Sequence, residues 1–154
     1  MAHAHTYRAK TVWTGAAKGP AGDYKTYSRE WTGAIAGKPS LRGSADAAFL
    51  GDASLYNPED LLLIALSTCH MLSYLALAAR SGIEVLAYED EAEGTMAIKD
   101  KRMRFVEVVL RPRVTIAESV DAGRAMALHT GAHDECFVAN SVNFPVRHEA
   151  KIVR

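Results

Sequence analysis

Apolar residues are densest in the middle of the chain, where a long run without Gly or Pro extends from Leu61 to Arg80. The residues on either side of this run are typical of helix ends. Asn57 is a good N-cap, Pro58 suits the first helical position, and Gly82 suits the position just beyond the last turn. The pattern therefore predicts one long helix of roughly 22–24 residues.

This helix is expected to be apolar on nearly all of its sides. Leu61–Leu66 contains no polar residue, and mostly apolar side chains continue from Met71 to Leu77. A helix with this pattern is buried on all faces, which is difficult for a chain of 154 residues to achieve alone. Two explanations stay open: a partner chain covers part of the helix, or the helix is covered by its own sheet.

Segments rich in β-forming residues lie on both sides of the long helix. Strands are expected at His5–Trp13, Tyr24–Ile35, around Ser40–Gly43, Ile83–Ala97, Met103–Thr115 and near Val146–Val153, with a second helix at about Ser119–His133. Lys99-Asp100-Lys101 predicts a hairpin turn, and Pro112 suggests a strand edge or exit. This order of elements predicts a single α+β domain over residues 1–154, with antiparallel strand pairing.

The composition indicates an ordinary folded protein. Apolar residues make up 49% of the chain and charged residues 23%, so a core can form and disorder is not expected. Lys+Arg (18) balances Asp+Glu (18), which leaves no basic surface for a nucleic acid or an anionic membrane. The start of the chain is polar, its His3 and His5 are interpreted as incidental, and it lacks the apolar run of a signal peptide. A cytoplasmic protein without a membrane span is therefore expected.

The two cysteines are the first candidates for chemistry. In a reducing compartment they are either buried small hydrophobic residues or active thiols. Cys69 lies in the middle of the long helix, where burial disfavours the thiolate, so a reactive Cys69 would need a cation close by. Cys136 follows the second helix, where a thiol can be reached and can move, which suits a resolving cysteine. The sequence alone does not establish that the two thiols meet.

Histidines offer a second reading of the same region. His129, His133 and Cys136 could lie on one helix face, and a structural metal site would then take Cys69 or His70 as its fourth ligand. No paired ligand motif is present, so solvated or capping histidines are the preferred interpretation. We therefore expect neither a metal nor another cofactor.

Glu59 is the most informative carboxylate. It precedes Cys69 by ten positions, which is roughly 15 Å of rise along a helix, so it cannot contact the cysteine of its own helix. If Glu59 serves Cys69, it does so from a second chain whose helix crosses this one. The alternative, which the spacing alone favours, is a first-turn acid that stabilises the helix dipole.

Together these segments resemble the OsmC/Ohr family of organic hydroperoxide resistance proteins. The resemblance covers most of the chain from about Tyr24 onward. The motifs that carry it are Asn57-Pro58-Glu59-Asp60-Leu61-Leu62, Ala65-Leu66-Ser67-Thr68-Cys69-His70-Met71, Ala132-His133-x-x-Cys136 and Asn140-Ser141. The family implies an OsmC-like fold, in which two long central helices cross in an intertwined homodimer beneath sheets built from both chains.

The resemblance also implies a reaction. It gives the protein thiol-dependent reduction of organic hydroperoxides, without a cofactor and with an external dithiol reductant such as a lipoyl protein. Cys69 resembles the peroxidatic cysteine, Cys136 the resolving cysteine, and Glu59 the acid that orients a catalytic arginine. Arg29 lies nearest the family position of that arginine, and Arg42 is the second candidate.

The segment after the second cysteine departs from part of the family. It reads Phe137-Val-Ala-Asn-Ser, where the Ohr branch typically has Pro-Tyr-Ser-Asn. The chain therefore looks more like the OsmC-like branch. The strongest alternative function is a non-catalytic protein of the same fold that binds a small apolar ligand at the dimer interface.

Overall fold

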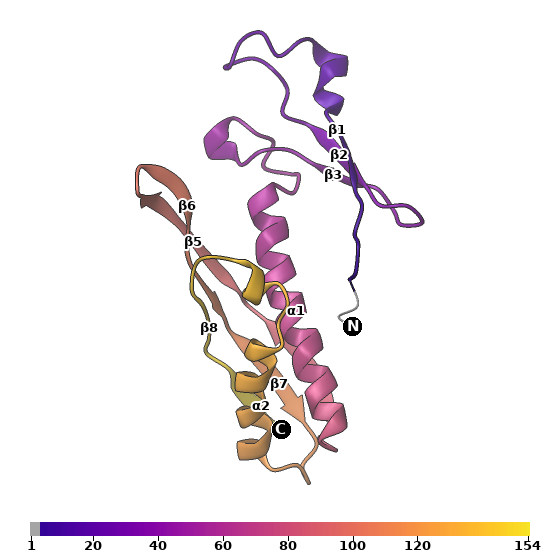
Figure 1. Cartoon of the computed structure of the whole chain (residues 1–154), viewed down its shortest axis with the longest axis vertical. Helices are drawn as coiled ribbons and strands as arrows, with labels where there is room; N and C mark the ends of the chain where they lie inside the picture. The colour runs from indigo at the N-terminus through magenta and orange to yellow at the C-terminus, as the bar shows by residue number, and fades with distance from the viewer. Residues whose placement is uncertain (1–3) are drawn as a thin grey trace. The chain divides into compact units, whose positions relative to one another are not determined.

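The computed structural model describes residues 4–154, and Figure 1 shows the arrangement of its elements within each part of the chain. His3 lies outside the described residues. The strands are β1 (Lys10–Val12), β2 (Trp31–Ala34), β3 (Leu41–Gly43), β4 (Val85–Asp90), β5 (Glu93–Lys99), β6 (Arg102–Leu110), β7 (Pro112–Ile116), β8 (Val146–His148) and β9 (Lys151–Val153); the helices are α1 (Pro58–Arg80) and α2 (Ala122–Asp134). The α+β class is confirmed. The chain divides into two compact units, of which the first ends at Leu61 and the second begins at Leu62.

The first unit is a small antiparallel sheet in the order β1-β2-β3. Its third strand was expected, but the first two are much shorter than the sequence predicts. The second strand is short because of a local turn. The Asp23 side chain accepts a hydrogen bond from the Lys25 backbone, and the Tyr27 amide donates to the Asp23 carbonyl. These bonds form a turn where the pattern predicted extended chain.

Helix α1 begins and ends as the sequence predicts. The Asn57 side chain accepts from the Asp60 amide at 2.8 Å, and the Asp60 carboxylate accepts from the Asn57 amide at 3.1 Å. This reciprocal pair satisfies two backbone donors at the helix start. At the other end Gly82 adopts a φ of 67°, and the Ile83 amide bonds back to the Ala78 carbonyl at 2.9 Å. Both features define a glycine-terminated helix.

The second unit contains two three-stranded sheets, β4-β7-β9 and β5-β6-β8. Strands β6 and β7 are the middle strands and follow one another with only Arg111 between them. The β5–β6 hairpin closes through Asp100 and Lys101, both with positive φ, as the turn pattern predicts. Pro112 is not at an edge: it is the first residue of the central strand β7, a position where its missing N–H is tolerated.

The expectation of purely antiparallel pairing is wrong for the last two strands. β8 runs parallel to β6 and β9 runs parallel to β7. The physical reason is the connection: α2 lies between β7 and β8, and a helical crossover returns the chain in the parallel direction.

Three predicted long strands are each divided in two by a bend. The breaks fall between β4 and β5, at Arg111, and between β8 and β9. At these breaks the Arg111 amide donates to the Asp90 carboxylate at 2.6 Å, and the Glu149 amide donates to the Leu110 carbonyl at 2.8 Å. The Arg111 guanidinium also pairs with Glu149 at 3.4 Å. The bend is thus stabilised by contacts between residues far apart in sequence.

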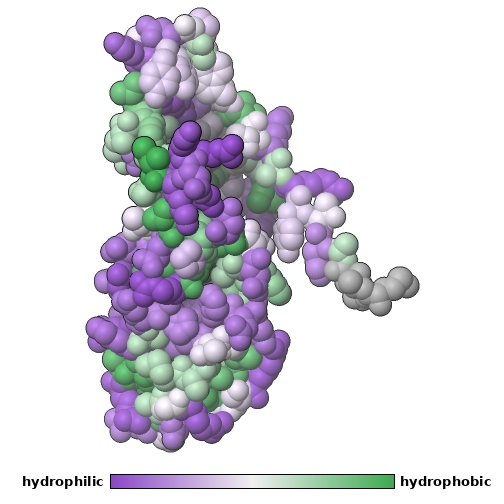
Figure 2. All heavy atoms as spheres, turned by 60° about the vertical axis from the view of Figure 1, so that its left-hand side comes forward, coloured by the Kyte–Doolittle hydropathy of each residue, from purple (hydrophilic) through white to green (hydrophobic). Residues whose placement is uncertain are grey.

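The chain buries one stripe of α1. Leu66, His70, Tyr74 and Ala78 recur every four residues and are buried against the second unit's sheets and α2. Leu72 on another side of the helix is 62% exposed. Helix α1 is therefore not covered on all faces by its own chain. On the face drawn in Figure 2, apolar side chains reach the surface between polar ones.

Candidate active site

Helices α1 and α2 bring the two cysteines close together. Cys69 is half-buried on α1, and Cys136 lies two residues beyond the end of α2 with 1% of its surface exposed. The Cys69 thiol lies near enough to Cys136 to raise the pKa of that second thiol, and both are free thiols. The structure thus brings together the pair whose proximity the sequence left open.

The two thiols have unequal surroundings. Burial raises the pKa of Cys136 to about 11; the hydrogen bond from Ala139 opposes this rise, and the nearby Cys69 thiol adds to it. The Ala139 amide lies 3.4 Å from the Cys136 sulfur. Cys136 is therefore a protonated, enclosed thiol at neutral pH, whereas Cys69 is the thiol that solvent or a substrate can reach.

The segment after α2 is fixed by its own hydrogen bonds. The Asn140 side chain donates to the Asp134 carbonyl at 2.8 Å, and the Ser141 hydroxyl donates to the Phe137 carbonyl at 2.7 Å. These bonds close a short helical turn directly after Cys136. The Asn140-Ser141 motif thus has a structural role, because it holds the backbone that carries the second thiol.

Sequence reasoning missed a buried histidine pair beside the cysteines. His70 Nε2 lies 3.0 Å from His129 Nδ1, and the side chains are 1% and 0% exposed. The ring planes differ by 5° with centroids 5.3 Å apart, so the rings lie edge to edge in one plane and the hydrogen bond runs between them. One signal was available: Ala125, His129, Ala132 and Cys136 are spaced by four, three and four residues, which places them on one helical face.

Both members of this histidine pair are neutral at pH 7. Burial lowers the pKa of His70 to about 4 and that of His129 to about 3, and the neighbouring imidazole of His148 acts in the same direction on both. Each neutral ring carries one N–H, so one ring donates in this hydrogen bond and the other accepts. Within the described chain, His70 Nδ1 and His129 Nε2 are buried without a hydrogen-bond partner.

The grouping considered as a metal site is arranged differently from a ligand set. His70 and His129 direct nitrogens at each other rather than at a common point. Among residues 4–154, no three or more His, Cys, Asp or Glu side chains are grouped so that they could hold a metal ion.

The other predicted site residues belong to the first unit, and the cysteines to the second. The Arg29 guanidinium donates to the carbonyls of Tyr27, at 2.7 Å, and Tyr24, and lies 4.0 Å from the centre of the Tyr27 ring. Arg42 on β3 is more exposed and pairs with Glu30 at 3.9 Å. Glu59 is half-buried in the first turn of α1. Arg29 is thus fixed by backbone and aromatic contacts, whereas Arg42 is held by one long ion pair.

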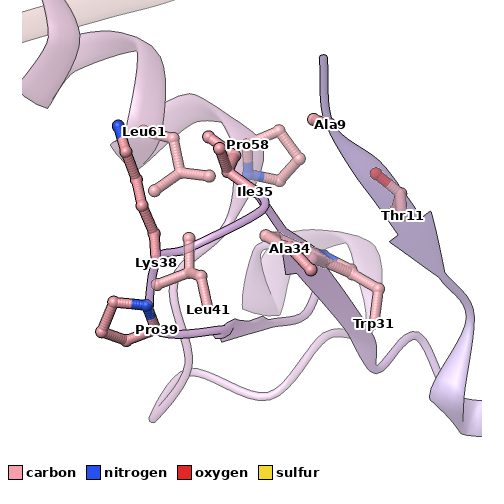
Figure 3. A pocket seen from close by; sticks show the side chains of 11 residues that line it. Ala9, Thr11, Trp31, Ala34, Ile35, Lys38, Pro39, Leu41, Pro58 and Leu61 are labelled. Carbon is pink, nitrogen blue, oxygen red and sulfur yellow. The ribbon is translucent and has the colours of Figure 1, made fainter.

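An apolar cavity of about 530 Å³ lies within the first unit. Figure 3 shows the side chains that surround it, with Trp31 and Leu41 from the sheet and Leu61 from the first turns of α1. The full lining is Ala9, Thr11, Trp31, Gly33, Ala34, Ile35, Lys38, Pro39, Leu41, Pro58 and Leu61. Such a lining suits an apolar molecule or an apolar protein surface.

Comparisons with known proteins identify the family. The model of the family described as OsmC-like protein matches residues 51–151, and the chain belongs to this family. An OsmC-like protein of unknown function from Vibrio cholerae is 30% identical, with a TM-score of 0.88 over 96% of this chain and all of that one.

More distant relatives agree with this assignment. The uncharacterized protein YmaD of Bacillus subtilis is 27% identical over 101 residues, which are 62% of this chain and 67% of YmaD. The organic hydroperoxide resistance protein OhrB of Bacillus subtilis shares the fold, with 18% identity and a TM-score of 0.63 over 96% of this chain and 98% of OhrB.

Proposed function

We propose that the protein is a thiol peroxidase that reduces organic hydroperoxides to alcohols through Cys69 and Cys136. The observation that carries the proposal is that one accessible thiol lies close to one enclosed thiol. Membership of the OsmC-like family supports it, as does the fold shared with a protein named for organic hydroperoxide resistance. We place the reaction in the cytoplasm, where reducing dithiols are available.

The reaction would proceed in three balanced steps. The Cys69 thiolate attacks the distal peroxide oxygen, the O–O bond breaks, and the alkoxide takes a proton to leave as an alcohol. Cys69 is then a sulfenic acid, which condenses with the Cys136 thiol to give a disulfide and water. An external dithiol reduces this disulfide by exchange and is itself oxidised to a disulfide. The proximity of the two thiols supports the second step, because a short movement would bring the sulfurs to bonding distance.

A direct test follows the consumption of cumene hydroperoxide by the reduced wild-type protein with dihydrolipoamide as electron donor. We expect turnover, and faster turnover than with hydrogen peroxide, because Leu72 and Phe137, close to the two cysteines in the sequence, expose apolar side chains that can bind an organic group. If no hydroperoxide is consumed, the peroxidase proposal fails. The apolar cavity of the first unit then favours the second candidate, a non-catalytic protein that binds a small apolar ligand.

We propose Arg29, oriented by Glu59, as the cation that favours the Cys69 thiolate and stabilises charge on the leaving oxygen. The Arg29→Lys variant is expected to lose about 10²-fold in kcat/KM, because Lys cannot reproduce a planar guanidinium with its fixed donors. The matched Arg42→Lys variant should stay within about twofold of wild type, since exposed ion pairs contribute little. Steady-state kinetics with cumene hydroperoxide measure both. The reverse ranking would transfer the role to Arg42.

We further propose that two copies form an intertwined homodimer through the uncovered side of α1. By length and composition α1 is apolar enough to cross a membrane, but one of its stripes is packed in the chain's own core. Ile64 and Leu72 on the uncovered side are 47% and 62% exposed. Exposed apolar side chains gathered on one side of a helix indicate a protein contact surface.

The dimer proposal predicts that Leu72→Arg weakens self-association by about tenfold or more, because a buried interface does not accommodate an unpaired charge. The Leu86→Arg variant is a matched control, since Leu86 is similarly exposed, at 60%, but lies on β4 and not on α1. Sedimentation equilibrium gives the dissociation constants. Equal constants for Leu72→Arg and wild type would remove α1 from the interface.

A further inference from the structure

Two hydrogen bonds join α1 to α2, and the two cysteines lie close together near the C-terminal end of α2. His70 bonds to His129, and the Tyr74 hydroxyl donates to the Ala125 carbonyl at 3.0 Å. Cys69 on α1 lies near enough to Cys136, just beyond α2, to raise the pKa of that thiol. Positions rise along α1 as they fall along α2. The two helices therefore run antiparallel, and these pairs of residues define how far one helix is shifted along the other.

The histidine bond is the contact beside the thiols that depends most on alignment. It joins one specific nitrogen on each side, Nε2 of His70 and Nδ1 of His129, and the two rings share a plane within 5°. Hydrogen bonds weaken steeply with distance and angle, so a small slide of one helix along the other would break it. Burial of both rings makes the broken state costly, because each would lose its only described partner.

We propose that His70 and His129 are positioning residues for the redox pair. Their hydrogen bond holds α1 and α2 in the alignment that keeps the Cys69 and Cys136 thiols close together, and so raises the effective concentration of one thiol toward the other. The inference deepens the proposed function and rests on it for the use of the disulfide. The geometry that carries it lies within the second unit.

The neighbours of the pair support this role. Tyr74 stacks on His129 at 4.2 Å between ring centres, which fixes the plane of the second imidazole. His148 lies 5.5 Å from His70 and 5.7 Å from His129 between ring centres. The pair is thus enclosed by rings on several sides, and its orientation is set before any substrate arrives.

The effective concentration of the two thiols can be measured against glutathione at pH 7.5 without any peroxide. Disulfide formation joins the two protein sulfurs and splits the S–S bond of glutathione disulfide. Two electrons pass to glutathione disulfide, and the two protein thiols give up their protons, so that two molecules of glutathione result. The equilibrium constant of this exchange reports how well the protein positions its thiols.

The variants are matched pairs of amides. The Gln amide can take the place of a histidine Nε2 and the Asn amide that of Nδ1, so His70→Gln and His129→Asn can keep the bond. His70→Asn and His129→Gln introduce an amide of similar polarity at a position from which it cannot form this hydrogen bond. We expect the first two to stay within about twofold of wild type and the second two to fall about tenfold, the worth of one hydrogen bond. Tyr74→Phe removes the neighbouring contact as a control and should change the constant less than His70→Asn does.

Three results would overturn the inference. These are equal constants within the matched pairs, a loss in Tyr74→Phe as large as in His70→Asn, or a wild-type constant no better than that of two unlinked thiols. The assay contains no hydroperoxide, so it separates the two proposals. A wild-type protein that positions its thiols as described but consumes no peroxide refutes the peroxidase and leaves the positioning role standing.

Discussion

Replacing Cys69 with Ser is expected to reduce the rate of hydroperoxide consumption about a thousandfold or more, to the level of the buffer. A hydroxyl is a far weaker nucleophile than a thiolate, and loss of the covalent nucleophile removes the first step altogether. Cys136 cannot substitute for it, because its thiol is 1% exposed and burial raises its pKa to about 11. The measurement is cumene hydroperoxide consumption with dihydrolipoamide in excess.

The matched Cys136→Ser variant should behave differently. It keeps the accessible thiol, so one equivalent of hydroperoxide should still be reduced in a first turnover. The reaction should then stall with Cys69 as a sulfenic acid, or continue slowly by direct attack of the donor. If Cys69→Ser turned over normally while Cys136→Ser reduced not even one equivalent, the roles of the two thiols would be the reverse of those proposed.

Acid is expected to destabilise the fold through the buried histidine pair. The pKa of His70 is lowered to about 4 and that of His129 to about 3, chiefly by burial, whereas both titrate near 6.5 when unfolded. Between these values the unfolded chain binds protons that the folded chain does not. The stabilisation is therefore complete above pH 6.5 and is lost as the pH falls toward 4, by up to about 1.4 kcal/mol per pH unit for each histidine.

The acid effect can be separated from that of carboxylates with the double variant His70→Gln/His129→Asn, whose amides do not titrate. Urea unfolding at pH 7, 6 and 5 gives the free energy of unfolding of each protein. The wild type should lose stability more steeply than the variant over this range. Parallel profiles for the two proteins would show that the histidines are not held neutral in the folded state.

The long helix could be predicted from sequence because its determinants are local. Asn57, Pro58 and Gly82 set its ends through bonds within a few residues, and the apolar run between them supplies its length. The strand breaks could not be predicted in this way. The hydrogen bond from the Arg111 amide to the Asp90 carboxylate joins residues twenty-one positions apart, and no local sequence pattern predicts it.

In the candidate site, too, the features set by nearby residues could be predicted, whereas those set by contacts between distant residues could not. The residue types and motifs of Cys69 and Cys136 marked them as chemical candidates, but only the packing of α1 against α2 brings their sulfurs together. From the sequence, His70 and His129 are predicted only as metal ligands or as solvated or capping side chains. Their hydrogen bond joins residues fifty-nine positions apart. The sequence therefore shows that His129 shares a helical face with Cys136, but not that His70 is its partner.

Whether Cys69 and Cys136 are a redox pair is tested most directly by adding one equivalent of cumene hydroperoxide to the fully reduced protein, without a donor, and identifying the oxidised sulfurs. We expect both free thiols to disappear together and peptide mapping to find Cys69 and Cys136 joined by a disulfide within one chain. Two thiols left unmodified after the hydroperoxide is added, or a Cys69 oxidised without ever joining Cys136, would contradict this expectation.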